Sequence, residues 1–233
     1  MSISMRRVRA IMVKDYKEFT RNYAISIVML FPLPFAYLYK DMDILVFSFI
    51  LNFTFAMLSC FMQAALIAEE KERNTLRSLM LTPATTMDVL IGKSSLVFMV
   101  SAVMLAAVTF IYGYEPNGLW VFLTAMVIST ILYTAAGTIC GLFSKSVMEA
   151  SLSVFPVLIL FTAAPFGFLL VDDFPIFKVL EYAPSTQLMH LVEMLTAGYS
   201  VEQAWKPLLI MLVWAVVLQA VSIVLYQKRL KDE

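Results

Sequence analysis

The chain of 233 residues is strongly apolar: 61% of its residues are hydrophobic, 15% are charged, and the formal net charge is zero. A soluble domain of this length has no interior large enough to bury so much apolar surface, so lipid must be the solvent. The balanced charge gives no basis for nucleic-acid binding. We expect an all-α integral membrane protein, because only helices satisfy the backbone of such apolar runs within lipid.

The first predicted element is an amphipathic helix within residues 1–21. Apolar side chains recur there every three or four residues, at Met5, Val8, Met12, Tyr16 and Phe19, and most of the charged side chains occupy the opposite side. Such a helix lies in the membrane interface, here on the cytoplasmic side. It serves as an anchor alone or also docks a cytoplasmic partner, and the residues leave both readings open.

Six stretches without Asp, Glu, Lys or Arg approach or exceed the roughly 20 apolar residues that a membrane span needs. They are residues 23–39, 44–68, 96–112, 119–143, 151–171 and 208–226. The first is short and contains Pro32 and Pro34, which predicts a kink or break. In the fourth, Gly137 and Gly141 are spaced to let another helix approach closely.

The basic residues predict the orientation. With both termini in the cytoplasm, every Lys and Arg except Lys40, Lys178 and Lys206 lies on the cytoplasmic side, as membrane insertion favours. Two connections are long: a cytoplasmic loop at 69–93 and an external segment at 172–206. In the latter we expect two short helices, separated at Pro184, that lean on the outer membrane face. The whole chain, 1–233, is predicted to be one domain.

The predicted spans carry no histidine and no carboxylate. We therefore expect no catalysis by this chain alone, and an ion-coupled carrier is disfavoured because such carriers use ionisable groups within the membrane. Gly92-Lys93-Ser94 resembles the end of a phosphate-binding loop, but Met87 stands where that motif requires glycine. Any energy for uphill transport must then enter from outside the bilayer.

The cytoplasmic loop has the features of a segment that transmits force. Thr75 can cap a short helix whose apolar stripe is Leu76, Leu79 and Met80, acidic residues cluster before it, and Pro83 ends it. A stiff helix joined at both ends to long spans would pass a push from a soluble partner to those spans.

Here the sequence resembles the membrane-spanning permease subunits of type-two ATP-binding cassette (ABC) exporters. The resemblance rests on Glu70-Lys71-Glu72-Arg73, Thr75-Leu76, Leu79, Pro83 and Gly92-Lys93, and on the arrangement of spans along the chain. One departure is Asn74, where the family often has glycine; asparagine still tolerates the left-handed backbone.

The resemblance implies a coupling helix in this loop, inserted into a cleft of a cytoplasmic ATPase subunit. The implied coupling residues are Glu70, Glu72, Thr75, Leu76, Leu79, Met80 and Pro83. It also implies a complex of two permease chains, identical or paralogous, with two ATPase chains in a prokaryotic cell membrane. ATP and magnesium would bind the ATPase, and no cofactor would bind this chain.

We predict that cargo passes between two permease chains, along the second and fifth spans. Asn52, Ser59 and Gln63 recur at helical spacing and so share one face. The candidate lining residues are aromatic or neutral and polar: Phe49, Asn52, Phe53, Ser59, Gln63, Phe155, Thr162 and Phe166. Such walls suit an amphipathic or hydrophobic cargo, such as a peptide, antibiotic, drug or lipid. Ordinary helix packing is the alternative for each residue.

Two other functions stay open at this point. One is a secondary carrier or channel, which the neutral spans disfavour. The other is a non-transporting membrane scaffold or sensor subunit. A soluble ATPase that assembles with the chain would favour the exporter over both.

Overall fold

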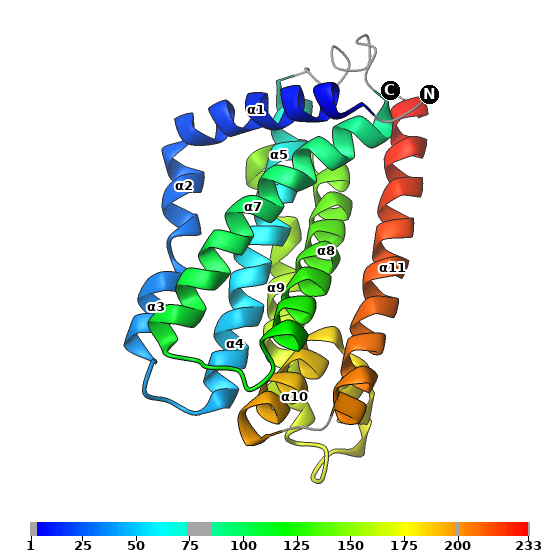
Figure 1. Cartoon of the computed structure of the whole chain (residues 1–233). Coiled ribbons are helices and arrows are strands. Elements are labelled where there is room, and N and C mark those ends of the chain that lie inside the picture. Colours follow the sequence, from blue (N-terminus) through cyan, green and yellow to red (C-terminus); the bar gives the residue numbers. More distant parts are fainter. Residues whose placement is uncertain (1–3, 74–84, 199–200, 233) are drawn as a thin grey trace.

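The computed structural model describes residues 4–73, 85–198 and 201–232, and within these ranges all regular structure is helical. The all-α prediction is therefore confirmed. The passes run alternately between two ends of one bundle, and both termini lie at the same end (Figure 1). The elements are α1 (Met5–Arg21), α2 (Tyr23–Met29), α3 (Pro32–Leu38), α4 (Ile44–Phe55), η1 (Ala56–Cys60), α5 (Phe61–Glu72), α7 (Thr86–Tyr112), α8 (Leu119–Phe143), α9 (Val147–Phe168), η2 (Pro175–Tyr182), α10 (Pro184–Ala197) and α11 (Val201–Asp232).

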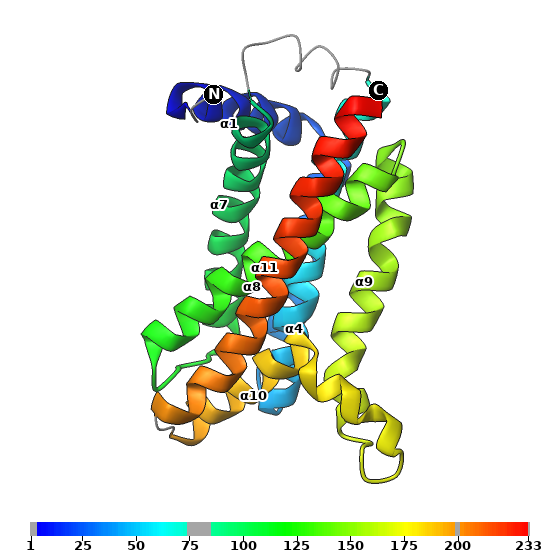
Figure 2. The same cartoon turned by 90° about the vertical axis from the view of Figure 1, so that its right-hand side faces the viewer.

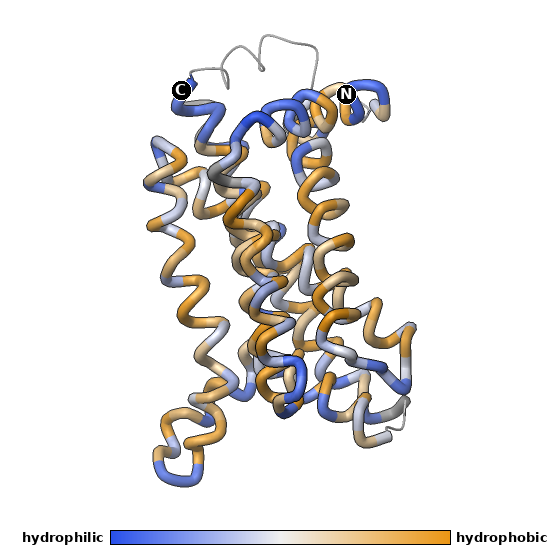
Figure 3. Tube along the Cα trace, turned by 90° about the vertical axis from the view of Figure 1, so that its left-hand side faces the viewer, coloured by the Kyte–Doolittle hydropathy of each residue, from blue (hydrophilic) through white to orange (hydrophobic). Residues whose placement is uncertain are grey.

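Among the described residues, five helices are long and apolar enough to cross a membrane: the continuous α4–η1–α5, then α7, α8, α9 and α11. The remaining pass is the broken pair α2 and α3, which is interrupted at Leu30 and Phe31 just before Pro32. This confirms the predicted break, since proline offers no backbone N–H to the preceding turn. Hydrophobic residues fill the middle of the bundle and hydrophilic ones gather at its two ends (Figure 3).

Helix α1 lies across the end of the bundle that carries both termini (Figure 1). Its buried residues are Val8, Ile11 and Asp15, whereas Met5 and Tyr16 of the predicted apolar side are 77% and 54% exposed. The predicted helix is confirmed, and beside its predicted apolar side it has a face that is buried against the bundle. That face includes a carboxylate, which the apolar spacing alone did not indicate.

The centre of the bundle is formed by α4–η1–α5 and α8, with α7 and α9 on opposite sides of it (Figures 1 and 2). At Gly141 an added Cβ would lie 2.8 Å from the carbonyl oxygen of Ala64, and at Gly137 it would clash with that of Cys60. The predicted close helix approach at these two glycines is confirmed. A feature that the sequence did not indicate is the single π-helical turn η1, which interrupts the second pass.

The segment before the last pass contains the two expected short helices, η2 and α10, with Pro184 at the first position of α10. The predicted position of α10 on the outer membrane face is wrong. Its leucines Leu188, Leu191 and Leu195 are completely buried. Rather than leaning on an outer surface, α10 packs against α4, α8, α9 and α11. Its apolar stripe removes more surface from water inside the bundle than it would at the interface.

Gly137→Leu should destabilise the bundle by at least about 1–3 kcal/mol, because the new side chain meets the backbone of Cys60 and not a flexible side chain. Thermal unfolding of the purified protein in detergent, followed by size-exclusion fluorescence, measures the change. Ala220→Leu adds a larger side chain at an exposed position of α11 and serves as the control. Equal melting temperatures for both variants would contradict the close approach.

Candidate functional site

Four charged side chains meet in the interior where α1, α5 and α7 join. The Lys93 ammonium lies 3.3 Å from a carboxylate oxygen of Asp15 and 3.0 Å from one of Glu70. The Lys14 ammonium lies 2.8 Å from the same Glu70 oxygen. The side chains of Lys93 and Asp15 are completely buried and that of Glu70 is 2% exposed. These residues, Lys14, Asp15, Glu70 and Lys93, form the α1 charge cluster, in which two cations balance two carboxylates.

A glycine makes this cluster possible. A Cβ at Gly92 would lie 2.9 Å from the Cβ of Ile11, so only glycine lets α1 come this close to α7. The next residue, Lys93, then reaches Asp15 and also donates a hydrogen bond to the Leu66 carbonyl at 3.2 Å. The pair Gly92-Lys93, which carried part of the family resemblance, therefore joins α1 to α7. Asp15 lies four residues after Ile11 and therefore on the same buried face of α1.

The surroundings shift the pKa values of the two α1 members. Burial raises the pKa of Asp15 above its ordinary value, while Lys93 opposes this shift. Burial also tends to lower the pKa of Lys14, but the Glu70 carboxylate outweighs that effect and holds the pKa well above its usual range. Asp15 thus depends on its neighbouring cations to remain ionised in the interior.

Three successive residues at the end of α5 bind four other helices. Glu70 binds α1 and α7 through the α1 charge cluster. The Lys71 ammonium donates to the carbonyls of Leu142 and Ser144, at 2.8 and 2.6 Å, where α8 ends. A carboxylate oxygen of Glu72 accepts the Val147 N–H, at 3.0 Å, where α9 begins. Lys71 thus lies at the C-terminal end of α8 and Glu72 at the N-terminal end of α9, where the helix dipoles favour a cation and an anion.

The start of α7 is also tied to α1. Thr85 and Asp88 form a capping box, in which each side chain accepts the backbone N–H of the other. Asp88 accepts two further hydrogen bonds from α1 and its cap, one from the Arg7 guanidinium at 2.7 Å and one from the Ser4 N–H at 2.9 Å. The α1 segment therefore contacts both helices that flank residues 74–84.

The predicted coupling residues are divided between the described and undescribed parts of the chain. Glu70 and Glu72 lie in the contacts given above, within this chain. The others lie outside the described residues, and their role stays a prediction: Thr75, Leu76, Leu79, Met80 and Pro83.

The polar members of the predicted pathway lie inside the bundle, where Asn52, Ser59 and Gln63 are completely buried. The Asn52 amide donates to the carbonyls of Ser48 and Ser185 and accepts from the Tyr133 hydroxyl, at 2.9, 3.4 and 3.0 Å. These contacts join α4 to α8 and α10.

The other two polar residues of this pass have different partners. Ser59 lies 3.0 Å from Ser101 of α7, and Gln63 donates to Thr138 of α8 at 3.1 Å. The expected shared face is therefore divided between two neighbouring helices, around the π-helical turn that contains Ser59. In α9, Thr162 is 6% exposed and donates to the Leu158 carbonyl of its own helix.

The aromatic members are more accessible. Phe49 stacks on Phe53 with ring centroids 6.1 Å apart and meets the edge of Phe166 at 5.8 Å, so these three gather between α4 and α9. Phe166 is 38% and Phe155 is 58% exposed. Phe155 lies eleven residues from Phe166, about 16 Å along α9. The pathway assignment stays a prediction, and for the buried polar members it requires helices to move apart.

Some buried polar atoms near these residues have no hydrogen-bond partner within the described chain. They are the Gln63 carbonyl oxygen and the hydroxyls of Ser185 and Thr186. Away from water, an unpaired polar atom costs about 1–3 kcal/mol. The interior at Gln63 of α5, and separately at the start of α10, therefore keeps hydrogen-bonding capacity that the described residues do not use.

Comparison with known proteins identifies one family. The family model described as ABC-2 family transporter protein matches residues 12–224, a range that includes the first five passes, most of the last one and all members of the α1 charge cluster. No curated protein matches the sequence.

Lys93→Met should destabilise the protein by about 3–5 kcal/mol, because it leaves one cation against two buried carboxylates. Adding Asp15→Leu removes one of those carboxylates and should recover at least half of the loss. Thermal unfolding in detergent measures both changes, with Lys17→Met on the exposed side of α1 as the control. If the double variant is less stable than Lys93→Met, the two residues do not act as a pair.

Proposed function

Since the chain belongs to the ABC-2 family of transporter proteins, we propose that it is the permease subunit of an ATP-driven exporter. It is a multi-pass membrane protein and a transport component, not itself a catalyst. Separate ATP-binding cassette subunits hydrolyse ATP with magnesium in the cytoplasm, where both termini of this chain also lie. Two permease chains, identical or paralogous, assemble in a prokaryotic cell membrane with the ATPase subunits.

The observation that supports energy coupling most directly is that Glu70, Lys71 and Glu72 bind four neighbouring helices. These residues precede segment 74–84 and bind α1, α7, α8 and α9, while Asp88 after the segment binds α1 again. The ATPase pushes on the predicted coupling helix at Thr75–Pro83. The helices on either side of the segment, α5 and α7, are bound to their neighbours by these contacts. A force on the coupling helix therefore moves this end of the bundle as one unit.

The cargo is an amphipathic or hydrophobic compound that moves outward between the permease chains. The exposed side chains Phe155 and Phe166 of α9 support this, since they offer aromatic surface along one pass. When α4 and α5 separate from α8 and α10, the buried amides of Asn52 and Gln63 become accessible. The unpaired Gln63 oxygen then finds a partner on cargo or water.

Leu76→Asp should leave the protein inserted and folded but abolish binding of the ATPase subunit, because it places a charge on the apolar stripe of the predicted coupling helix. Co-purification with an untagged ATPase measures the ratio of the two subunits. Lys17→Asp adds a carboxylate at the same end of the molecule, on an exposed part of α1, and should keep that ratio. If Leu76→Asp retained both subunit ratio and transport, this assignment of the coupling helix would be wrong.

Reconstitution in lipid vesicles tests the function as a whole. Vesicles that contain the permease and its ATPase should accumulate a hydrophobic cargo only with hydrolysable ATP and magnesium. Transport of the same cargo by the permease chain alone, against a concentration gradient, would exclude the ATP-driven exporter in favour of a secondary carrier.

A further inference from the structure

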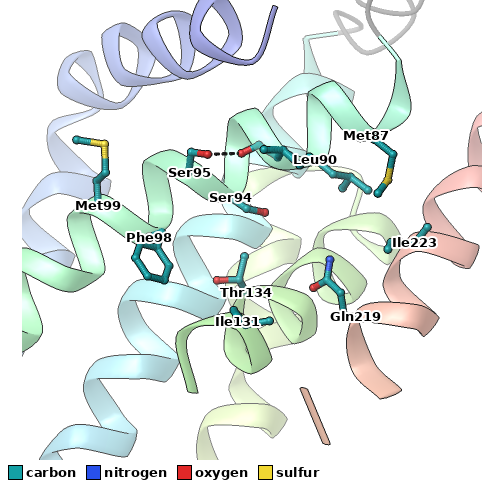
Figure 4. A pocket seen from close by; sticks show the side chains of 11 residues that line it. Met87, Leu90, Ser94, Ser95, Phe98, Met99, Ile131, Thr134, Gln219 and Ile223 are labelled. Carbon is teal, nitrogen blue, oxygen red and sulfur yellow. Dashed lines mark hydrogen bonds between the residues drawn. The ribbon is translucent and has the colours of Figure 1, made fainter. Parts of the chain in front are cut away.

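Two hollows meet on the side of the bundle formed by α7, α8 and α11. The first has a volume of about 390 Å³ and lies among all three helices (Figure 4). The second, of about 400 Å³, lies between α7 and α8. Phe98 lines both, so the two hollows are adjacent, and we call them together the α7 groove. Each hollow is within the range of ligand-binding pockets, and none of the predicted pathway residues lines either.

The hollow nearer the chain termini has a mainly apolar lining that includes several polar side chains. Ser94, Thr134 and Gln219 surround it from three different helices (Figure 4). The Thr134 hydroxyl donates to the Thr130 carbonyl of its own helix at 2.6 Å. The Ser94 hydroxyl and the Gln219 amide have no hydrogen-bond partner among the residues that the structure describes. In a membrane such groups need a partner, and a ligand with acceptor oxygens would supply it.

The second hollow is almost entirely apolar. Ala102 and Ala106 of α7 leave space opposite Phe122 and Met126 of α8. Among the residues that the structure describes, no charged side chain lines either hollow. This lining suits a hydrocarbon chain and disfavours an ion or a sugar.

The order of the two hollows matches the depth of a lipid in the bilayer. Lys93, which directly precedes Ser94, binds Asp15 of the amphipathic helix α1, so Ser94 lies close to the level of the membrane interface. Ala106 lies twelve residues further along α7, about 18 Å deeper, and half of the hydrocarbon thickness is about 15 Å. The first hollow is thus at interfacial depth. The second begins below it, passes the bilayer midplane near Ala106 and continues to the far end of α7, where Tyr114 and Pro116 line it.

We propose that the α7 groove binds one phospholipid from the leaflet next to α1. Its ester carbonyls accept hydrogen bonds from Ser94 and Gln219, and one acyl chain passes Phe98 to lie against Ala102 and Ala106. This lipid site is separate from the predicted cargo pathway. It does not depend on the ATPase, so its failure in a test would leave the proposed export function untouched.

The full-length chain in nanodiscs of phosphatidylethanolamine and phosphatidylglycerol tests the proposal without nucleotide or ATPase. A trace of phosphatidylethanolamine with a diazirine on one acyl chain is photolysed, and the labelled peptides are identified by mass spectrometry. We expect strong labelling of the groove-lining parts of α7 and α8. Ala106→Phe fills the groove at an exposed position and should lower this labelling at least tenfold.

Two further variants separate a specific site from ordinary boundary lipid. Val103→Phe, at a 69% exposed position of α7 outside the groove, should keep the labelling of wild type. Gln219→Met removes the amide at similar volume and should lower the labelling about threefold. Ala102→Leu replaces Ala106→Phe if the latter fails to fold.

Equal labelling in Ala106→Phe and in Val103→Phe would overturn the proposal, since it would show only boundary lipid along α7. Absence of labelling in the wild-type groove would also overturn it, and would indicate that a second chain or a closed groove excludes lipid there.

Discussion

The pairing of Lys93 with Asp15 and Glu70 is the interaction on which the arrangement of α1, α5 and α7 depends. Removing a single partner from such a buried group costs far more than an exposed ion pair contributes, because an uncompensated charge remains in the interior. The three helices can therefore move together but not apart. Glu70 is also the first of three residues that bind further helices, so the cluster extends its constraint to α8 and α9.

Much of the fold could be predicted because lipid restricts what a sequence can do. The absence of charges from long apolar stretches located the passes, Pro32 located the break, and Gly137 with Gly141 located a close helix contact. Pro184 placed the start of α10. Each of these signals is local, since it depends on residues within one helix or one turn.

The α1 charge cluster could not be predicted in the same way. Asp15 and Lys93 are 78 residues apart, and nothing in the spacing of either indicates the other. Glu70 and Lys93 lie in a segment of mixed charge that is typical of a solvated loop, yet both side chains are buried. The burial of α10 depends likewise on contacts with distant helices. The side of the second pass on which Ser59 and Gln63 lie depends on η1, which no pattern in the sequence indicated.

That π-helical turn also determines where the chain can tolerate a change in length. A π-helical turn is an α-helix with one surplus residue. Loss of one residue within Ala56–Cys60 would let α4 and α5 join as a regular helix, with both halves still facing their present neighbours. The same deletion in the middle of α8 would rotate everything beyond it by about 100° and carry Gly137 and Gly141 away from α5. Segment 56–60 is thus a part of the central helices where evolution could remove a residue without reorganising the bundle.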